Sequence, residues 1–148
     1  MKLRKFAYGT LLGIVGLFGM AGTASADPSF NEGTVSVVAS IRTETGHFDD
    51  YMAWLQNTWK KGMEAQKAAG IIVAYNVYLA RPRTADDPDV YLVMTYKNLA
   101  AMDGLADRVE GVTSKVLGTR AEQSAANADR AKIRTVLGSE VIREAILK

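Results

Sequence analysis

The sequence predicts an α+β fold in which one antiparallel sheet carries helices, and three observations support this. Runs rich in β-branched and aromatic residues cover 35–41, 71–80 and 90–96, and each has the length of a strand. Apolar residues at helical spacing separate the first run from the second. A second helical stretch follows the third run, so the order is strand, helix, strand, strand, helix.

The beginning of the chain has the three parts of a secretory signal peptide. Three basic residues lie within the first five positions, an apolar stretch covers 11–20, and small residues fill 24–26. The apolar stretch is shorter than the roughly 20 residues that a membrane span requires. We therefore expect cleavage of residues 1–26, and a single domain over 27–148 that works in the periplasm or outside the cell without a membrane segment.

Charge and cysteine content exclude several classes of function. The leader holds three of the 18 basic residues and none of the 16 acidic ones, so the mature chain has a net charge of about −1. No basic stripe with interleaved aromatic residues remains, so we expect no binding to nucleic acid. The chain has no cysteine and therefore no disulfide, so an ordinary hydrophobic core must hold it together.

The first strand and the first helix follow from their spacing. We expect residues 27–33 to be an irregular lead-in and residues 35–41, which alternate in polarity, to form a strand with one buried face. Hydroxyl groups of the turn over 43–46 can cap the helix that follows, and Gly70 can end it. The apolar stripe of this helix recurs at spacings of 4, 3, 4 and 4, and consists of Phe48, Met52, Leu55, Trp59 and Met63.

The sequence of the second half of the chain predicts a hairpin, further helices and a tail. The runs 71–80 and 90–96 flank a segment full of turn formers, so we expect an antiparallel hairpin with a long loop. Asn98 fits the N-cap of the next helical stretch. Residues 119–132 are rich in alanine and charge, which favours an extra, exposed helix. The periodicity of 139–147 suits a helix and a strand equally well.

The order of the predicted elements assigns the tail to a strand, a choice that periodicity alone does not make. A final strand completes the order β-α-β-β-α-β, the ferredoxin-like split unit, with the extra helical segment before that last strand. Helices would then cover one face of the sheet, while the strands offer apolar side chains on both faces. A second copy of the chain is the cover that we expect for the other face.

The chain resembles the dimeric α/β-barrel superfamily, which includes antibiotic-biosynthesis-type monooxygenases and stress-responsive barrel proteins. The resemblance rests on the strand over 35–41, the turn with Gly46, the helix that opens at 47–51 and the tyrosine-rich hairpin, and it spans 34–147. It implies a homodimer whose sheets pack face to face, with a small cleft in each subunit between sheet and helices. The resemblance is strongest to uncharacterised exported members, so it implies no particular activity.

The sequence also departs from the active branches of this superfamily. Haem-dependent members use a histidine ligand that usually lies elsewhere, and the single histidine here is His47, in the turn before the helix. Cofactor-independent oxygenases of the superfamily surround their substrate with an Asn, a Trp and other polar groups. Asn57 with Trp54 or Trp59 could imitate that arrangement. We expect no cofactor.

The candidate ligand-binding residues are aromatic side chains and one amide. Small-molecule pockets have mostly apolar walls and a few polar groups that fix orientation. The alternative is that the same aromatic side chains form the core and the dimer interface. The candidate set consists of Trp54, Asn57, Trp59, Tyr75, Tyr78, Tyr91 and Tyr96.

Other polar residues carry weaker hypotheses. His47 could be a general base or a metal ligand, although a lone histidine makes no zinc site and an exposed turn position is the simpler interpretation. The acidic segment 86–89 lacks the ligand spacing of an EF-hand, so a solvated loop is favoured over a metal site. Arg81, Arg83 and Arg134 could hold a carboxylate or a phosphate. No nucleophile motif occurs.

Three functions remain open at this point. The leading hypothesis is an exported homodimer that binds a small, largely apolar molecule, with no defined activity. The first alternative is a cofactor-independent monooxygenase or isomerase, which oxygen consumption on quinols or anthrones would reveal. The second alternative is a structural dimer whose cleft is filled by its own side chains and whose role is protein contact.

Overall fold

The structure is a computed structural model that describes residues 28–148, so the predicted signal peptide at 1–26 lies outside the described residues. Its elements, in chain order, are β1 (Phe30–Thr43), α1 (Phe48–Trp54), the π-helical turn η1 (Leu55–Trp59), α2 (Lys60–Ala68), β2 (Ala74–Leu79), β3 (Val90–Tyr96), the short 3-10 helix η2 (Leu99–Met102), α3 (Leu105–Leu117), α4 (Arg120–Arg130) and β4 (Arg134–Leu147).

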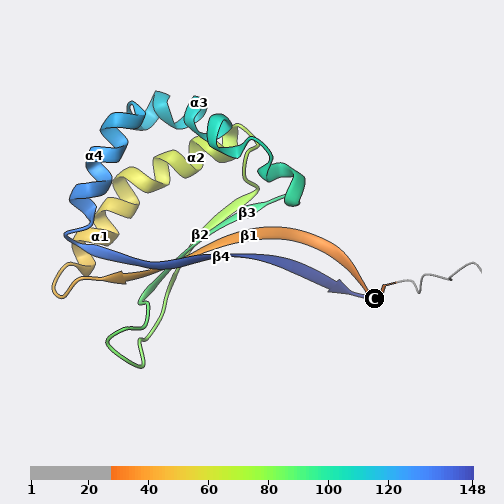
Figure 1. Cartoon of the computed structure of the whole chain (residues 1–148), viewed down its shortest axis with the longest axis horizontal. Helices are drawn as coiled ribbons and strands as arrows, with labels where there is room; N and C mark the ends of the chain where they lie inside the picture. Colours follow the sequence, from red (N-terminus) through yellow and green to blue (C-terminus); the bar gives the residue numbers. More distant parts are fainter. Residues whose placement is uncertain (1–27) are drawn as a thin grey trace, which may run out of the picture.

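The four strands form one antiparallel sheet in the order β2-β3-β1-β4. All four α-helices lie on one side of this sheet (Figure 1). This arrangement is the ferredoxin-like α+β fold expected from the sequence. The tail is a strand, as topology predicted, and α4 is the extra helix before it.

The neighbouring strands β1 and β4 are longer than the sequence predicted. β1 starts at Phe30, so the prediction of an irregular lead-in over 27–33 was wrong for most of that segment. The reason lies far away in the sequence, because Phe30, Asn31 and Glu32 pair with Leu147, Ile146 and Ala145 of β4. β1 and β4 thereby extend together as a ribbon beyond the helices (Figure 1).

The first helical segment is not one continuous α-helix. The N–H of Lys60 donates to the carbonyl of Leu55, which closes one wide π-turn between α1 and α2. The helix starts at its cap residue His47 without any side-chain cap, so the predicted hydroxyl cap was wrong. The Thr43 hydroxyl instead donates to the carboxylate of Asp89.

The core lies between the helices and the sheet. Tyr51 of α1 is 1% exposed, whereas Phe48, the first residue of the predicted stripe, is 36% exposed at the helix start. Tyr96 of β3 is 3% exposed and also belongs to the core. Two clusters of buried residues make up this core, and Trp59 packs against both of them.

The second half of the chain folds largely as its turn chemistry predicts. β2 and β3 pair as an antiparallel hairpin. The side chain of Asn98 accepts the N–H of Ala101 at 3.0 Å, which is the expected cap. α4 begins with a capping box in which Thr119 and Glu122 exchange hydrogen bonds, and it buries none of its residues.

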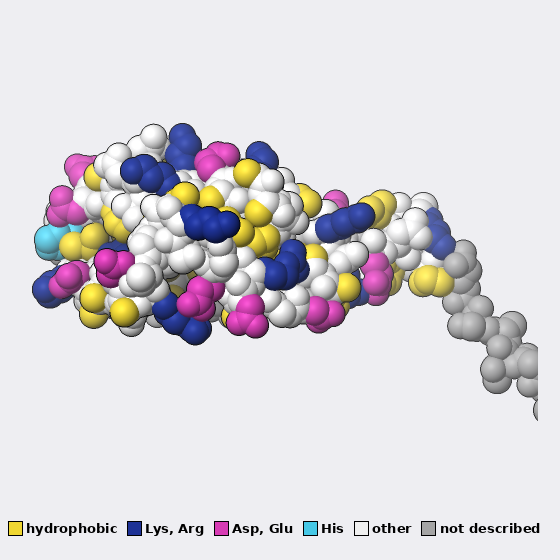
Figure 2. Space-filling model, turned by 90° about the horizontal axis from the view of Figure 1, so that it is seen from above, with side chains coloured by type: hydrophobic (Ala, Val, Ile, Leu, Met, Phe, Trp, Pro, Cys, Tyr) yellow, Lys and Arg dark blue, Asp and Glu magenta, His cyan; other side chains and the backbone are white. Residues whose placement is uncertain are grey.

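The face of the sheet opposite the helices, which we call the open face, is uncovered in a single chain. Side chains alternate along β1, and Val35 and Ile41 point to the helices, so Val38 points to the open face. Val93 of β3 and Glu140 of β4 lie opposite Val38 in register. The helical side, in contrast, carries charges of both signs scattered over its surface (Figure 2). Within residues 28–148, no helix has the length and hydropathy that a membrane crossing requires.

Candidate functional site

A pocket of about 270 Å³ lies at the junction of the helical layer and β2. Most of its wall is apolar or aromatic, and only an amide, an ammonium group and a phenol interrupt it. This composition is typical of sites for small apolar molecules. Its lining residues are Met52, Leu55, Gln56, Trp59, Lys60, Tyr75 and Val77.

The π-turn η1 builds the helical wall of this pocket. It spans Leu55 to Trp59, and both of these end residues line the pocket. A π-turn inserts one extra residue into a helix and turns the side chains that follow, and such turns are frequent at functional sites. The sequence does not predict this turn, because the steps of four residues from Leu55 to Trp59 and on to Met63 also fit an unbroken α-helix.

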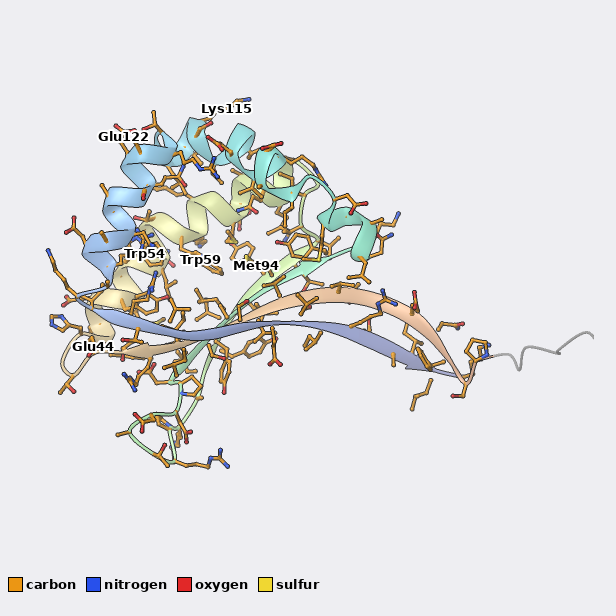
Figure 3. All side chains as sticks on the ribbon, in the orientation of Figure 1. Glu44, Trp54, Trp59, Met94, Lys115 and Glu122 are labelled. Carbon is orange, nitrogen blue, oxygen red and sulfur yellow. The ribbon has the colours of Figure 1, made fainter. Side chains whose placement is uncertain are left out.

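Trp59 and Tyr75 meet edge to face in this pocket. Their ring centroids lie 5.3 Å apart and their planes are inclined by 84°. Figure 3 shows Trp59 directed from the helical layer toward the sheet. The hydroxyl of Tyr75 donates to the carboxylate of Glu64, and this hydrogen bond raises the pKa of Tyr75 to about 12. Tyr75 is therefore protonated at neutral pH.

The other predicted tyrosines do not join this pocket. Tyr78 and Tyr91 are direct partners on neighbouring strands and lie on the open face, because Val77 and Leu92 beside them point to the helices. Tyr78 is 55% exposed. Tyr96 is buried in the core, where burial raises its pKa.

Asn57 and Trp54 lie outside the pocket as well. Asn57 is an exposed residue of η1. Trp54 is half-buried and stacks on Tyr51, with 5.6 Å between the two ring centroids. The guanidinium group of Arg130 lies over the Trp54 ring, 4.3 Å from the ring centroid. Figure 3 places Trp54 near the end of α4. The sequence pattern did not predict that Tyr51 and Arg130 would contact Trp54.

Several larger hollows in the described chain have a different chemistry, because charged residues take part in their linings. One of about 760 Å³ between α2 and α3 includes Lys60, Lys61 and Glu64 in its lining. Another of about 620 Å³ at the β1/β4 ribbon includes Lys97 and Arg143. Their charged linings suit solvated surface grooves, so the smaller aromatic pocket is the better candidate for an apolar ligand.

Several of the polar residues that the sequence singled out have protein partners. Nδ1 of His47 lies 2.8 Å from the Asp50 carboxylate in the first turn of α1. Asp86 pairs with Arg42, and Asp87 accepts from the backbone of the same loop. Within the described chain, no three His, Asp or Glu side chains gather closely enough to hold a metal ion.

The chain matches no family model and no curated protein by sequence. Solved structures do resemble it. HapK from Hahella chejuensis has 13% identity and a TM-score of 0.51, over 74% of this chain and 91% of that one. A dimeric ferredoxin-like protein of unknown function from Thermobifida fusca has 14% identity and a TM-score of 0.45, over 79% of this chain and 94% of that one.

The likeness to HapK concerns the fold alone, at this level of identity. The strand order β2-β3-β1-β4 and the helices on a single face of the sheet define this fold in the chain itself. The chain therefore has the ferredoxin-like α+β fold that its resemblance to the dimeric α/β-barrel superfamily implied.

Proposed function

We propose that this protein is an exported homodimer that binds a small, largely apolar molecule in the cleft between its sheet and its helices. The pocket at η1 and β2 is the observation that carries this proposal. It is walled by Trp59, Tyr75 and aliphatic side chains. Its volume of about 270 Å³ lies just below the usual range for ligand sites, which begins at roughly 300 Å³, so the ligand is small.

The polar groups of the pocket support binding better than catalysis. The Tyr75 hydroxyl is engaged by Glu64 and keeps its proton at neutral pH, so it is a poor base. Gln56 and Lys60 are exposed residues of the lining, where they can fix the orientation of a ligand. The apolar walls supply the binding energy, because their surface leaves water when a ligand enters.

The open face and β4 support the homodimer. β4 is a 14-residue edge strand that is exposed over nearly its whole length, including Val141 and Ile142. A long exposed edge strand with apolar side chains invites pairing with another chain. A second copy laid against the open face would bury Val38 and Val93 together with Ile142. Export is supported by the composition of residues 1–26.

Blocking the mouth of the pocket tests the binding proposal. Gln56 is exposed and lines the pocket, so Gln56→Trp should fill the opening without disturbing the core. Calorimetric titration with 2-naphthol, a neutral bicyclic probe, should show one saturable site per subunit in the wild type. We expect Gln56→Trp to weaken that binding by at least about tenfold, a loss of roughly 1.4 kcal/mol.

Ala53→Trp is the matched control, because it adds the same side chain to an exposed position of α1 outside the pocket lining. It should leave the affinity for 2-naphthol unchanged. Equal affinities in all three proteins, or no saturable binding in the wild type, would rule out this pocket as the site.

A further inference from the structure

Two arginine side chains come together beside Trp54, where α4 ends and β4 begins. Nη2 of Arg134 donates to Oδ1 of Asn127 at 2.8 Å, and Nη2 of Arg130 donates to the same oxygen at 3.3 Å. Two positive charges thus converge on one neutral amide. Neither arginine forms an ion pair with a carboxylate among residues 28–148.

In the part of the chain that the structure describes, the Arg130 side chain does not have a hydrogen-bond acceptor for each of its donors. Its Nε is buried and has no hydrogen-bond partner within the described chain. A buried donor of this kind is costly, and charged donors are costlier still. Arg130 lies in the last turn of α4, where the helix dipole stabilises a positive charge. This effect does not explain why its Nε is buried without an acceptor.

The surroundings offer one more donor and an apolar wall. The phenol of Tyr51 lies near both arginines, whose positive charges oppose the rise that burial causes in the pKa of Tyr51, and it can serve as the further donor. The indole of Trp54 lies under the Arg130 guanidinium at 4.3 Å and stacks on the Tyr51 ring. The nearby Asp89 is already occupied, since both of its carboxylate oxygens bond Thr43.

We propose that Arg130, Arg134 and the Tyr51 hydroxyl form a binding site for a small carboxylate anion, with Trp54 as its apolar wall. The planar carboxylate matches the planar guanidinium group, and an aromatic or aliphatic body can rest against the indole. Burial and the neighbouring charge of Arg134 lower the pKa of Arg130, and a bound anion would counteract both effects. The site shares no residue with the lining of the pocket at η1 and β2, so it is independent of the proposed function.

Trp54 is a built-in reporter for this site. The chain has two tryptophans, so Trp59→Phe leaves Trp54 as the single one. In that background, sodium benzoate at constant ionic strength should change the Trp54 fluorescence saturably, and sodium acetate should bind more weakly because it lacks the ring. Inorganic phosphate should bind more weakly than benzoate. A phosphate affinity above that of benzoate would overturn the carboxylate assignment.

Arginine variants locate the binding. Arg130→Gln and Arg134→Gln should each weaken benzoate binding at least tenfold, whereas Arg81→Gln, at an exposed loop position, should change nothing. Arg134→Lys keeps the positive charge and replaces the glutamine variant if that variant fails to fold. It should still bind benzoate more weakly than the wild type, because lysine lacks the planar guanidinium group. An affinity that is equal in all variants, or a fluorescence change that never saturates, would overturn the proposal.

Discussion

Tyr75 is the residue whose titration best reports the chemistry of the pocket. A tyrosine becomes charged only when it loses its proton, and the hydrogen bond to Glu64 raises its pKa from 10.0 to about 12. The folded state therefore favours the neutral form. This stabilisation is fully present below pH 10 and is lost as the pH rises through about 12.

A spectroscopic titration checks this prediction. The phenolate absorbance of the wild type minus that of Tyr75→Phe should give a midpoint near 12 for Tyr75. Glu64→Ala should move the midpoint back toward 10.0, whereas Glu110→Ala, which removes a carboxylate from α3, should not move it. A midpoint that is the same with and without Glu64 would show that the two side chains do not interact.

The sequence predicted part of the candidate site residue by residue. Trp59 was expected because it lies on the apolar stripe, and it does meet Tyr75. Tyr75 and Tyr78 could not have shared a site, because positions three apart in a strand point to opposite faces. Arg130 escaped notice because it stands in an alanine-rich stretch without periodic apolar residues, and only the fold brings it to Trp54.

Among the elements, the end of the first helical segment was predictable from local chemistry, although its start was not. The first helical segment ends at Ala68, and Gly70 follows with φ +67°, a left-handed conformation that disfavours any side chain. Gly70→Ala should lower the free energy of unfolding by about 1–2 kcal/mol. Gly111→Ala is the matched control, since Gly111 lies inside α3 with open space around it, and it should raise that free energy by about 0.5–1 kcal/mol.

Urea unfolding at one protein concentration measures both effects, because the stability of a dimer depends on concentration. Shifts of the same sign in the two variants would contradict the backbone conformation assigned to Gly70.

The elements that local pattern could not fix are those decided by distant partners. The tail suited a helix as well as a strand, and its pairing with β1 over most of its length settled the matter. The same pairing extended β1 back to Phe30. The π-turn was missed for another reason, because one inserted residue alters the apolar spacing only slightly.

At the scale of the whole molecule, the proposed homodimer uses the open face as its interface. Val38→Lys places a charge at its centre, and the lysine can pair with Glu140 across the strands, so the single chain should still fold. Burial of that charge between two sheets is costly, so we expect the dimer to dissociate to monomers in light-scattering measurements at micromolar concentration.

Val116→Lys is the matched control for this change. Val116 is an exposed valine of α3, on the helical side of the sheet, and its replacement should leave the oligomeric state unchanged. Dissociation in both variants, or in neither, would show that the open face is not the interface.

Native mass spectrometry of the wild-type protein, purified from the exported fraction and compared before and after denaturation, tests the central claim most directly. The proposed function predicts a chain that starts near residue 27, a dimeric mass, and an adduct of a few hundred daltons that is released on denaturation, the rough size of a ligand for such a pocket. A monomer, or a dimer that carries no adduct and binds no apolar probe, would contradict it.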